Sequence, residues 1–155
     1  MCPISCTYSL EFITTEDHPR RGVAFLISED EKVVAKSAFD LLNEEVERAL
    51  RTRFDAWVDG LTNKKWYHGW NQSEFRGKYT KCFVFKCKEK RSFHRFYGFL
   101  SNPRSSDPSY QVCILVNHAF KSEWETDEAD LKDVEEIRMS YLVQKIIDNY
   151  FRETP

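Results

Sequence analysis

Apolar and polar residues alternate near the start of the chain, and three further apolar-rich segments follow in its second half. Alternation with a period of two is typical of β-strands that bury one face. The first strand is predicted over 7–13. Three more are predicted over 79–88, 92–100 and 110–120. Because only residues 89–91 separate 79–88 from 92–100, we expect these two strands to form an antiparallel hairpin.

Several segments depart from simple alternation. The run 111–116 is almost entirely apolar, which is typical of a central strand covered on both faces. The shorter apolar run 23–27 fits either a strand or the entry to a helix. Residues 63–76 are irregular and aromatic, and 102–108 form a loop that has prolines near both ends.

Two regions show the spacing of helices. Between 30 and 60, apolar residues recur mostly three or four positions apart, which predicts a helical hairpin. Asn43 can cap its second helix, and Gly60 can end it. In the C-terminal third, Asp127 can cap a helix over 128–151, whose acidic first turns complement the helix dipole.

Together these elements predict an α+β fold with a mostly antiparallel sheet of four to five strands. The helical hairpin and the C-terminal helix are expected to pack on one face and to leave a basic opposite face. The length of 155 residues fits one domain. We divide it into an N-terminal strand and extension, a helical hairpin, a basic β-meander and a C-terminal helix, at 1–30, 31–60, 79–121 and 127–151.

The distribution of charge along the chain indicates a surface that binds a polyanion. The stretch 64–104 contains eleven Lys or Arg and only two acidic residues, a charge of about +9. The whole chain has a net charge of −2, so the remainder carries about −11. Aromatic residues are interleaved with the cations of 64–104, and this combination suits single-stranded nucleic acid. The alternative is that the rings form a core and the lysines are solvated.

Cysteine and histidine usage argues against a metal site. The five cysteines include no CxxC pair, so we expect reduced and mostly buried thiols. The four histidines are scattered, and no metal or other cofactor is expected. The chain has no apolar run of membrane-spanning length and no N-terminal secretory signal, so a cytoplasmic location is expected.

Short motifs in the second half resemble the RelE/ParE superfamily of bacterial toxins, particularly its HigB-like members. In Phe93-His-Arg-Phe-Tyr-Gly-Phe99, Arg95 precedes an aromatic pair, and the following strand ends in Ala119-Phe120-Lys121. Glu123-Trp-Glu-Thr-Asp127 and Phe75-Arg-Gly-Lys-Tyr79 are similar to the flanking segments of that family. The resemblance covers roughly residues 40 to 137. Ser122 stands where the family often has a second lysine.

The resemblance implies an endoribonuclease, or mRNA interferase, that cuts mRNA in the ribosomal A site, inhibits growth and is neutralised by a cognate antitoxin. A runner-up function belongs to another class. It is a non-catalytic protein of the same fold, such as a phage or host-defence factor, that binds nucleic acid or an acidic protein partner.

Cleavage of RNA by its own 2′-OH needs a base, cations for the phosphate and an acid for the leaving oxygen. Arg95 is the first candidate for stabilising the phosphate in the transition state, and Lys121 could assist it. His94 and His118 are expected to be neighbours on adjacent strands and to form an acid–base pair. Tyr97 shares a strand face with Arg95, whereas His94 must face the other way unless a bulge intervenes.

Further basic residues are candidates for binding RNA rather than for cleaving it. These are Arg76, Lys81, Lys86, Lys88 and Arg91. The acidic run 123–136 would repel a polyanion. We therefore expect the C-terminal helix to pack at one edge of the sheet, with its acidic face turned away from Arg95 and Lys121.

Overall fold

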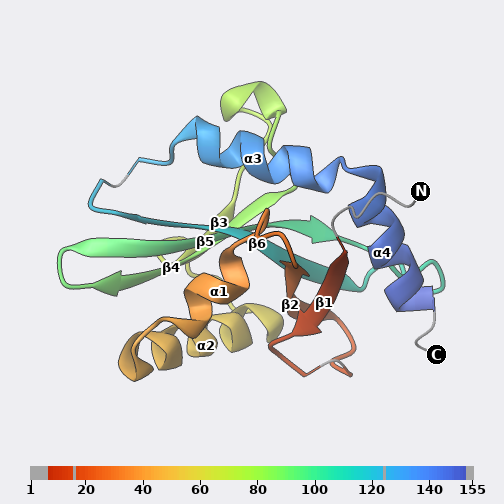
Figure 1. The fold of residues 1–155 in the computed structure, drawn as a ribbon, viewed down its shortest axis with the longest axis horizontal. Coiled ribbons are helices and arrows are strands. Elements are labelled where there is room, and N and C mark those ends of the chain that lie inside the picture. Colours follow the sequence, from red (N-terminus) through yellow and green to blue (C-terminus); the bar gives the residue numbers. More distant parts are fainter. Residues whose placement is uncertain (1–6, 16, 124, 153–155) are drawn as a thin grey trace.

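A six-stranded sheet runs through the middle of the protein, with the strand order β1-β2-β6-β5-β4-β3 (Figure 1). The computed structural model describes residues 7–15, 17–123 and 125–152. The strands are β1 (Tyr8–Phe12), β2 (Arg21–Ser28), β3 (Tyr67–Gly69), β4 (Cys82–Glu89), β5 (Ser92–Ser101) and β6 (Gln111–Lys121). Only β2 and β6 pair in parallel, so the predicted α+β class with a mostly antiparallel sheet is confirmed, although the sheet has six strands rather than the four to five expected.

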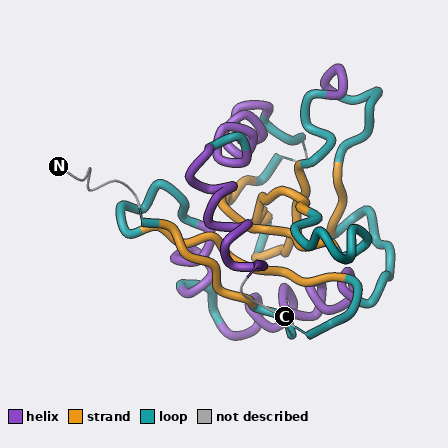
Figure 2. Tube along the Cα trace, turned by 90° about the vertical axis from the view of Figure 1, so that its right-hand side faces the viewer, coloured by secondary structure: helices purple, strands orange, loops and turns teal. Residues whose placement is uncertain are grey.

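Helices cover both faces of this sheet (Figures 1 and 2). On one face lie α1 (Ala35–Asp40) and α2 (Glu44–Val58), and on the other lie α3 (Glu128–Arg138) and α4 (Tyr141–Arg152). The prediction of helices on one face and an open basic face is therefore wrong. The central strand β6 explains why. Its consecutive residues Ile114 and Leu115 point to opposite faces and both are fully buried, so each face of the sheet needs a cover.

The helix starts predicted at Asn43 and Asp127 are confirmed by capping bonds, whereas the first helix begins only at Ala35 and has no side-chain cap. The side chain of Asn43 accepts a hydrogen bond from the Val46 amide at 2.9 Å, and that of Asp127 accepts one from the Ala129 amide at 3.0 Å. The single C-terminal helix predicted over 128–151 is interrupted at Met139 and Ser140. A straight helix could not bury both of its apolar stripes, because α3 packs on β4, β5 and β6 whereas α4 packs on β1.

Two segments without a clear pattern are strands in the structure. The undecided run 23–27 lies within β2. The stretch 63–76, expected to be irregular, contains the three-residue edge strand β3, which pairs with β4. Three residues are too short for alternation to show. Within the described part of the chain, no helix is both long enough and apolar enough to cross a membrane.

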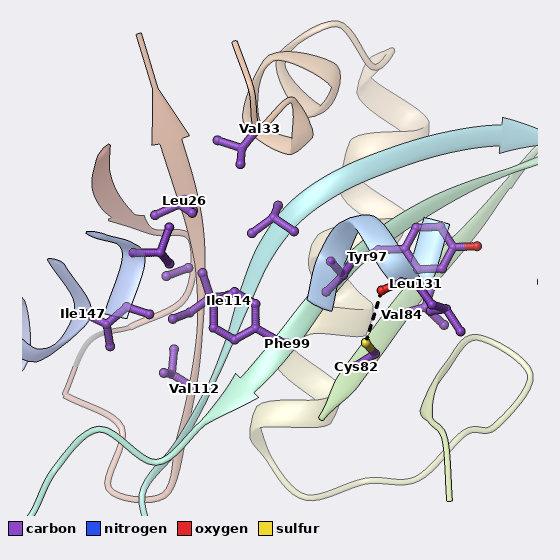
Figure 3. Close-up of a cluster of buried hydrophobic side chains, with 14 of the residues drawn as sticks. Leu26, Val33, Cys82, Val84, Tyr97, Phe99, Val112, Ile114, Leu131 and Ile147 are labelled. Carbon is purple, nitrogen blue, oxygen red and sulfur yellow. Dashed lines mark hydrogen bonds between the residues drawn. The ribbon is translucent and has the colours of Figure 1, made fainter. Parts of the chain in front are cut away.

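The hydrophobic cluster under α3 extends along the sheet to Tyr97 (Figure 3). Leu131 of α3 lies beside Val84 and Tyr97, and the Tyr97 hydroxyl points away from the cluster. The ladder between β5 and β6 has a bulge between Tyr97 and Gly98. A Cβ on Gly98 would lie 2.3 Å from the Ile114 carbonyl oxygen, so only glycine allows the two strands to approach this closely.

Candidate nucleic-acid interface

Two cations are buried side by side on the face of the sheet that α3 covers. Lys86 of β4 and Arg95 of β5 are direct cross-strand partners, and they are 7% and 0% exposed. Neither forms an ion pair with a carboxylate among the described residues. Burial lowers the pKa of Lys86, and the charge of Arg95 lowers it further. Like charges directly opposite each other destabilise a sheet, so this cation pair requires an explanation.

The guanidinium of Arg95 is enclosed by main chain. Its Nη1 donates to the carbonyl oxygen of Glu125 at 3.2 Å, and its Nη2 donates to that of Glu123. Its Nε has no acceptor among the residues that the structure describes. The connection between β6 and α3 therefore covers Arg95 with carbonyl dipoles rather than with a carboxylate.

Acidic side chains at the start of α3 continue this cover. The ammonium of Lys121 lies 2.8 Å from an oxygen of Asp130 and 3.5 Å from one of Asp127. Tyr79 donates a hydrogen bond of 2.7 Å to Glu128, and burial together with this bond raises the pKa of Tyr79 to about 12. We refer to residues 123 and 125–130 as the acidic cap.

The position of the acidic cap contradicts the expectation that the acidic face of the C-terminal helix is turned away from Arg95 and Lys121. Two causes are visible. Leu131 and Val134 are both fully buried and fix α3 over the middle of the sheet. Lys121 then offers a counter-charge to the first turn of that helix.

His68 and Trp70 lie beside the cation pair. His68 pairs with Val84 and so points to the same face as Lys86. Burial lowers the pKa of His68, and the charges of Lys86 and Arg95 act in the same direction. The ring of Trp70 lies 4.9 Å from that of His68 and 6.5 Å from that of Tyr97. The sequence had given His68 no role, and its only signal was the density of aromatic residues around it.

His94 and His118 are neighbours, as the strand pairing predicted, but they lie on the face covered by α1 and α2. His94 Nδ1 is 2.9 Å from His118 Nε2, and His94 Nε2 is 2.7 Å from Glu89 Oε1. Asn43 donates to the other oxygen of Glu89 at 3.3 Å. Burial and the proximity of His94 lower the pKa of His118 to about 4.

The sheet therefore separates the candidate catalytic residues into two groups. Arg95, Tyr97 and Lys121 point to the α3 face, whereas His94 and His118 point to the other. The bulge does not change this, because it lies beyond these positions. The histidine pair and Arg95 cannot contact the same phosphate, and a role for either group in catalysis stays a prediction.

The other basic candidates lie at the surface. Arg76, Lys81, Lys88 and Arg91 are exposed, and only Lys86 of the predicted RNA-binding set is buried.

Cys82, Cys87 and Cys113 are free and buried, whereas Cys2 and Cys6 lie outside the described residues. Among the described residues, no group of three or more His, Cys, Asp or Glu could hold a metal ion.

Comparisons with protein-family models, with curated proteins and with solved structures found no match to this chain.

Replacing Lys86 by methionine should stabilise the protein. The substitution keeps the length of the side chain and removes a buried charge for which the described residues supply no carboxylate. We expect the free energy of unfolding in urea at pH 7 to rise by about 1–2 kcal/mol. The matched control is Lys88→Met, two residues along the same strand and exposed, which should change it by less than about 0.5 kcal/mol. A loss of stability in Lys86→Met would mean that the Lys86 charge has a favourable partner.

His118→Gln should make stability less sensitive to acid. The folded state lowers the pKa of His118 from 6.5 to about 4, so between these pH values the unfolded chain binds a proton that the folded chain does not. The contribution of His118 to the free energy of unfolding is therefore complete above pH 6.5 and is lost as the pH falls towards 4. Allowing for partial exposure, we expect the wild type to lose on the order of 1–2 kcal/mol more than the variant over this interval. Urea unfolding at pH 7 and pH 4.5 measures the difference, and equal losses would contradict it.

Proposed function

We propose that this protein is a toxin-like endoribonuclease that binds mRNA at the Lys86–Arg95 pair and cleaves it without a metal ion. The observation that carries the proposal is the burial of two adjacent cations for which the described residues supply no carboxylate. A phosphate group is the ligand that would neutralise both. Arginine can bind phosphate through two parallel hydrogen bonds, and lysine adds a point charge.

The residues on the α3 face can be assigned to the three tasks of RNA cleavage. His68, whose lowered pKa favours a neutral imidazole, would take the proton from the 2′-OH. The 2′-oxygen would attack phosphorus while Lys86 and Arg95 stabilise the negative charge. The bond from phosphorus to the 5′-oxygen would break, and Tyr97 or Lys121 would protonate that oxygen. The products would be a 2′,3′-cyclic phosphate and a 5′-OH.

In this proposal the acidic cap must move before RNA can reach Arg95, because its two η nitrogens already donate to the carbonyl oxygens of Glu123 and Glu125. By the family resemblance, a cognate antitoxin would neutralise the active protein.

One observation favours the non-catalytic alternative. Arg95 is fully buried, and its hydrogen bonds to the carbonyl oxygens of Glu123 and Glu125 also fit a structural role, in which it holds the cap on the sheet. RNA or an acidic protein partner would then bind the exposed basic residues at the tip of the β4–β5 hairpin, which extends beyond the helices (Figure 1). Binding without cleavage would distinguish this alternative.

We expect binding of single-stranded RNA to depend on salt and on Lys86. In fluorescence anisotropy titrations, affinity should fall steeply with salt, because each neutralised phosphate releases counterions. Removing one phosphate contact by Lys86→Met should reduce the slope of log affinity against log salt by about 0.7. The control is Lys145→Met, which removes an exposed lysine of α4 and should leave the slope unchanged.

The same preparations distinguish the two functions. For the nuclease, cleavage products should form in the presence of EDTA, and Lys86→Met should slow cleavage by roughly 100-fold. Expression of the wild type should arrest growth, and expression of Lys86→Met should not. RNA that is bound but not cut would support the alternative. If RNA affinity does not change with salt and is the same in Lys86→Met and Lys145→Met, the nucleic-acid function itself is overturned.

Weakening the acidic cap should increase RNA affinity. Asp127→Asn with Asp130→Asn removes both carboxylates that contact Lys121, and asparagine at 127 can still cap α3. We expect affinity at low salt to rise several-fold, while the free energy of unfolding changes by less than about 1 kcal/mol. Asp133→Asn with Glu136→Gln, two exposed changes on the same helix, is the control for net charge. If the Asp127/Asp130 variant binds no better than this control, the cap does not lie on the path of the RNA.

A further inference from the structure

A cavity of about 600 Å³ lies at the β3 edge of the sheet, next to the C-terminal end of α2. Its walls include four large aromatic side chains, Trp57, Tyr67, Trp70 and Phe83, each less than a tenth exposed. Aromatic rings in the wall suit a planar heterocycle, since every nucleobase has a π-face that stacks on such rings.

Cationic and polar groups complete the cavity. The guanidinium of Arg21 lies 4.6 Å from the Trp57 ring and donates to the Trp57 carbonyl oxygen at 2.6 Å, so it is held in place. Lys64 lines the cavity and is exposed, and no ion pair of its ammonium occurs among the described residues. Glu74 also lines the cavity, and one of its oxygens accepts a hydrogen bond from the Asn71 amide.

The cavity adjoins the cation pair. His68 and Trp70 line it, and the same two side chains lie beside Lys86, Arg95 and Tyr97. Trp57, Tyr67 and Phe83 belong to the core on the α2 face, so the cavity is lined by residues from both faces at the β3 edge. A nucleic-acid strand with one phosphate at Lys86 would pass round this edge to place a neighbouring base in the cavity.

The loop that bounds the cavity has an unusual backbone. Phe75 and Arg76 follow Glu74 directly, and both have positive φ angles, of 48° and 58°. Two successive non-glycine residues in this conformation raise the free energy of the loop, and such conformations are concentrated at binding and active sites.

We propose that this cavity binds a nucleobase, with the ring among the aromatic side chains and the attached phosphate towards Lys64. This inference rests on the proposed function, because it makes the cavity the base subsite of the same RNA surface. A free mononucleotide offers the same chemistry as one nucleotide of an RNA strand. A peptide adding to the sheet fits less well, because β3 offers an edge of only three residues.

Calorimetric titration with AMP, GMP, CMP and UMP tests the proposal. At least one mononucleotide should saturate the wild type at one site. Thr62→Trp places a bulky ring on an exposed residue that lines the cavity, and it should weaken binding more than tenfold. Lys64→Ala should weaken it about threefold through loss of an exposed charge contact. The matched control is Lys65→Ala, whose ammonium lies over Trp66 at 5.0 Å and does not line the cavity, and which should bind as the wild type does.

Nucleosides separate base recognition from simple attraction of phosphate. A nucleoside should bind more weakly than its nucleotide and should be insensitive to Lys64→Ala, yet it should still be excluded by Thr62→Trp. Failure of every mononucleotide to bind, or unchanged binding in Thr62→Trp, would overturn the proposal.

RNA titrations of the same variants keep this inference distinct from the proposed function. If RNA binding depends on Lys86 while no mononucleotide binds, the cavity proposal fails and the function stands. If a mononucleotide is excluded by Thr62→Trp while RNA does not bind at all, the cavity proposal stands and the RNA function fails.

Discussion

The enclosure of a buried like-charge pair is the constraint on which much of this structure depends. Lys86 and Arg95 are opposite each other on adjacent strands, and burying an ion costs several kcal/mol unless other groups compensate. For Arg95 the compensation comes from the carbonyl oxygens of Glu123 and Glu125. These oxygens can reach the guanidinium only if the chain turns back over the sheet directly after β6. That turn brings the acidic first turn of α3 onto Lys121.

Alternation along β5 imposes a second constraint. Consecutive residues of a strand point to opposite faces, so His94 and Arg95 belong to different environments although they are adjacent in sequence. The histidine side is a closed chain of hydrogen bonds from Asn43 through Glu89 and His94 to His118. The cation side lies next to the cavity and is covered by a segment held through main-chain carbonyls. Chemistry on a phosphate needs one face, and His68 is the described histidine on the same face as the cation pair.

These two constraints explain what could be predicted from the sequence. Alternation located β1, apolar-rich segments located β4, β5 and β6, and the capping residues Asn43 and Asp127 located the starts of α2 and α3, because these signals are local. The strand β3 could not be predicted, since three residues carry no period. The cover over Arg95 could not be predicted either, because carbonyl oxygens are present in every residue and only the tertiary fold brings those of Glu123 and Glu125 to the guanidinium. The same reason applies to His68. It lies beside the cation pair because β3 pairs with β4, and its position in the sequence does not indicate that pairing.

The cap also sets how strongly any anion can bind. A ligand that engages Arg95 must displace two carbonyl oxygens, so its apparent affinity is its intrinsic affinity multiplied by the fraction of molecules with the cap open. An anion that engages only Lys86 displaces no carbonyl oxygen or carboxylate of the described residues, although this side chain is itself only 7% exposed. The two cations therefore differ in availability although they are direct neighbours. Under the proposed function, a strand of RNA would contact Arg95 only after the cap opens, and the acidic cap would then be the element through which a protein partner controls access to the site.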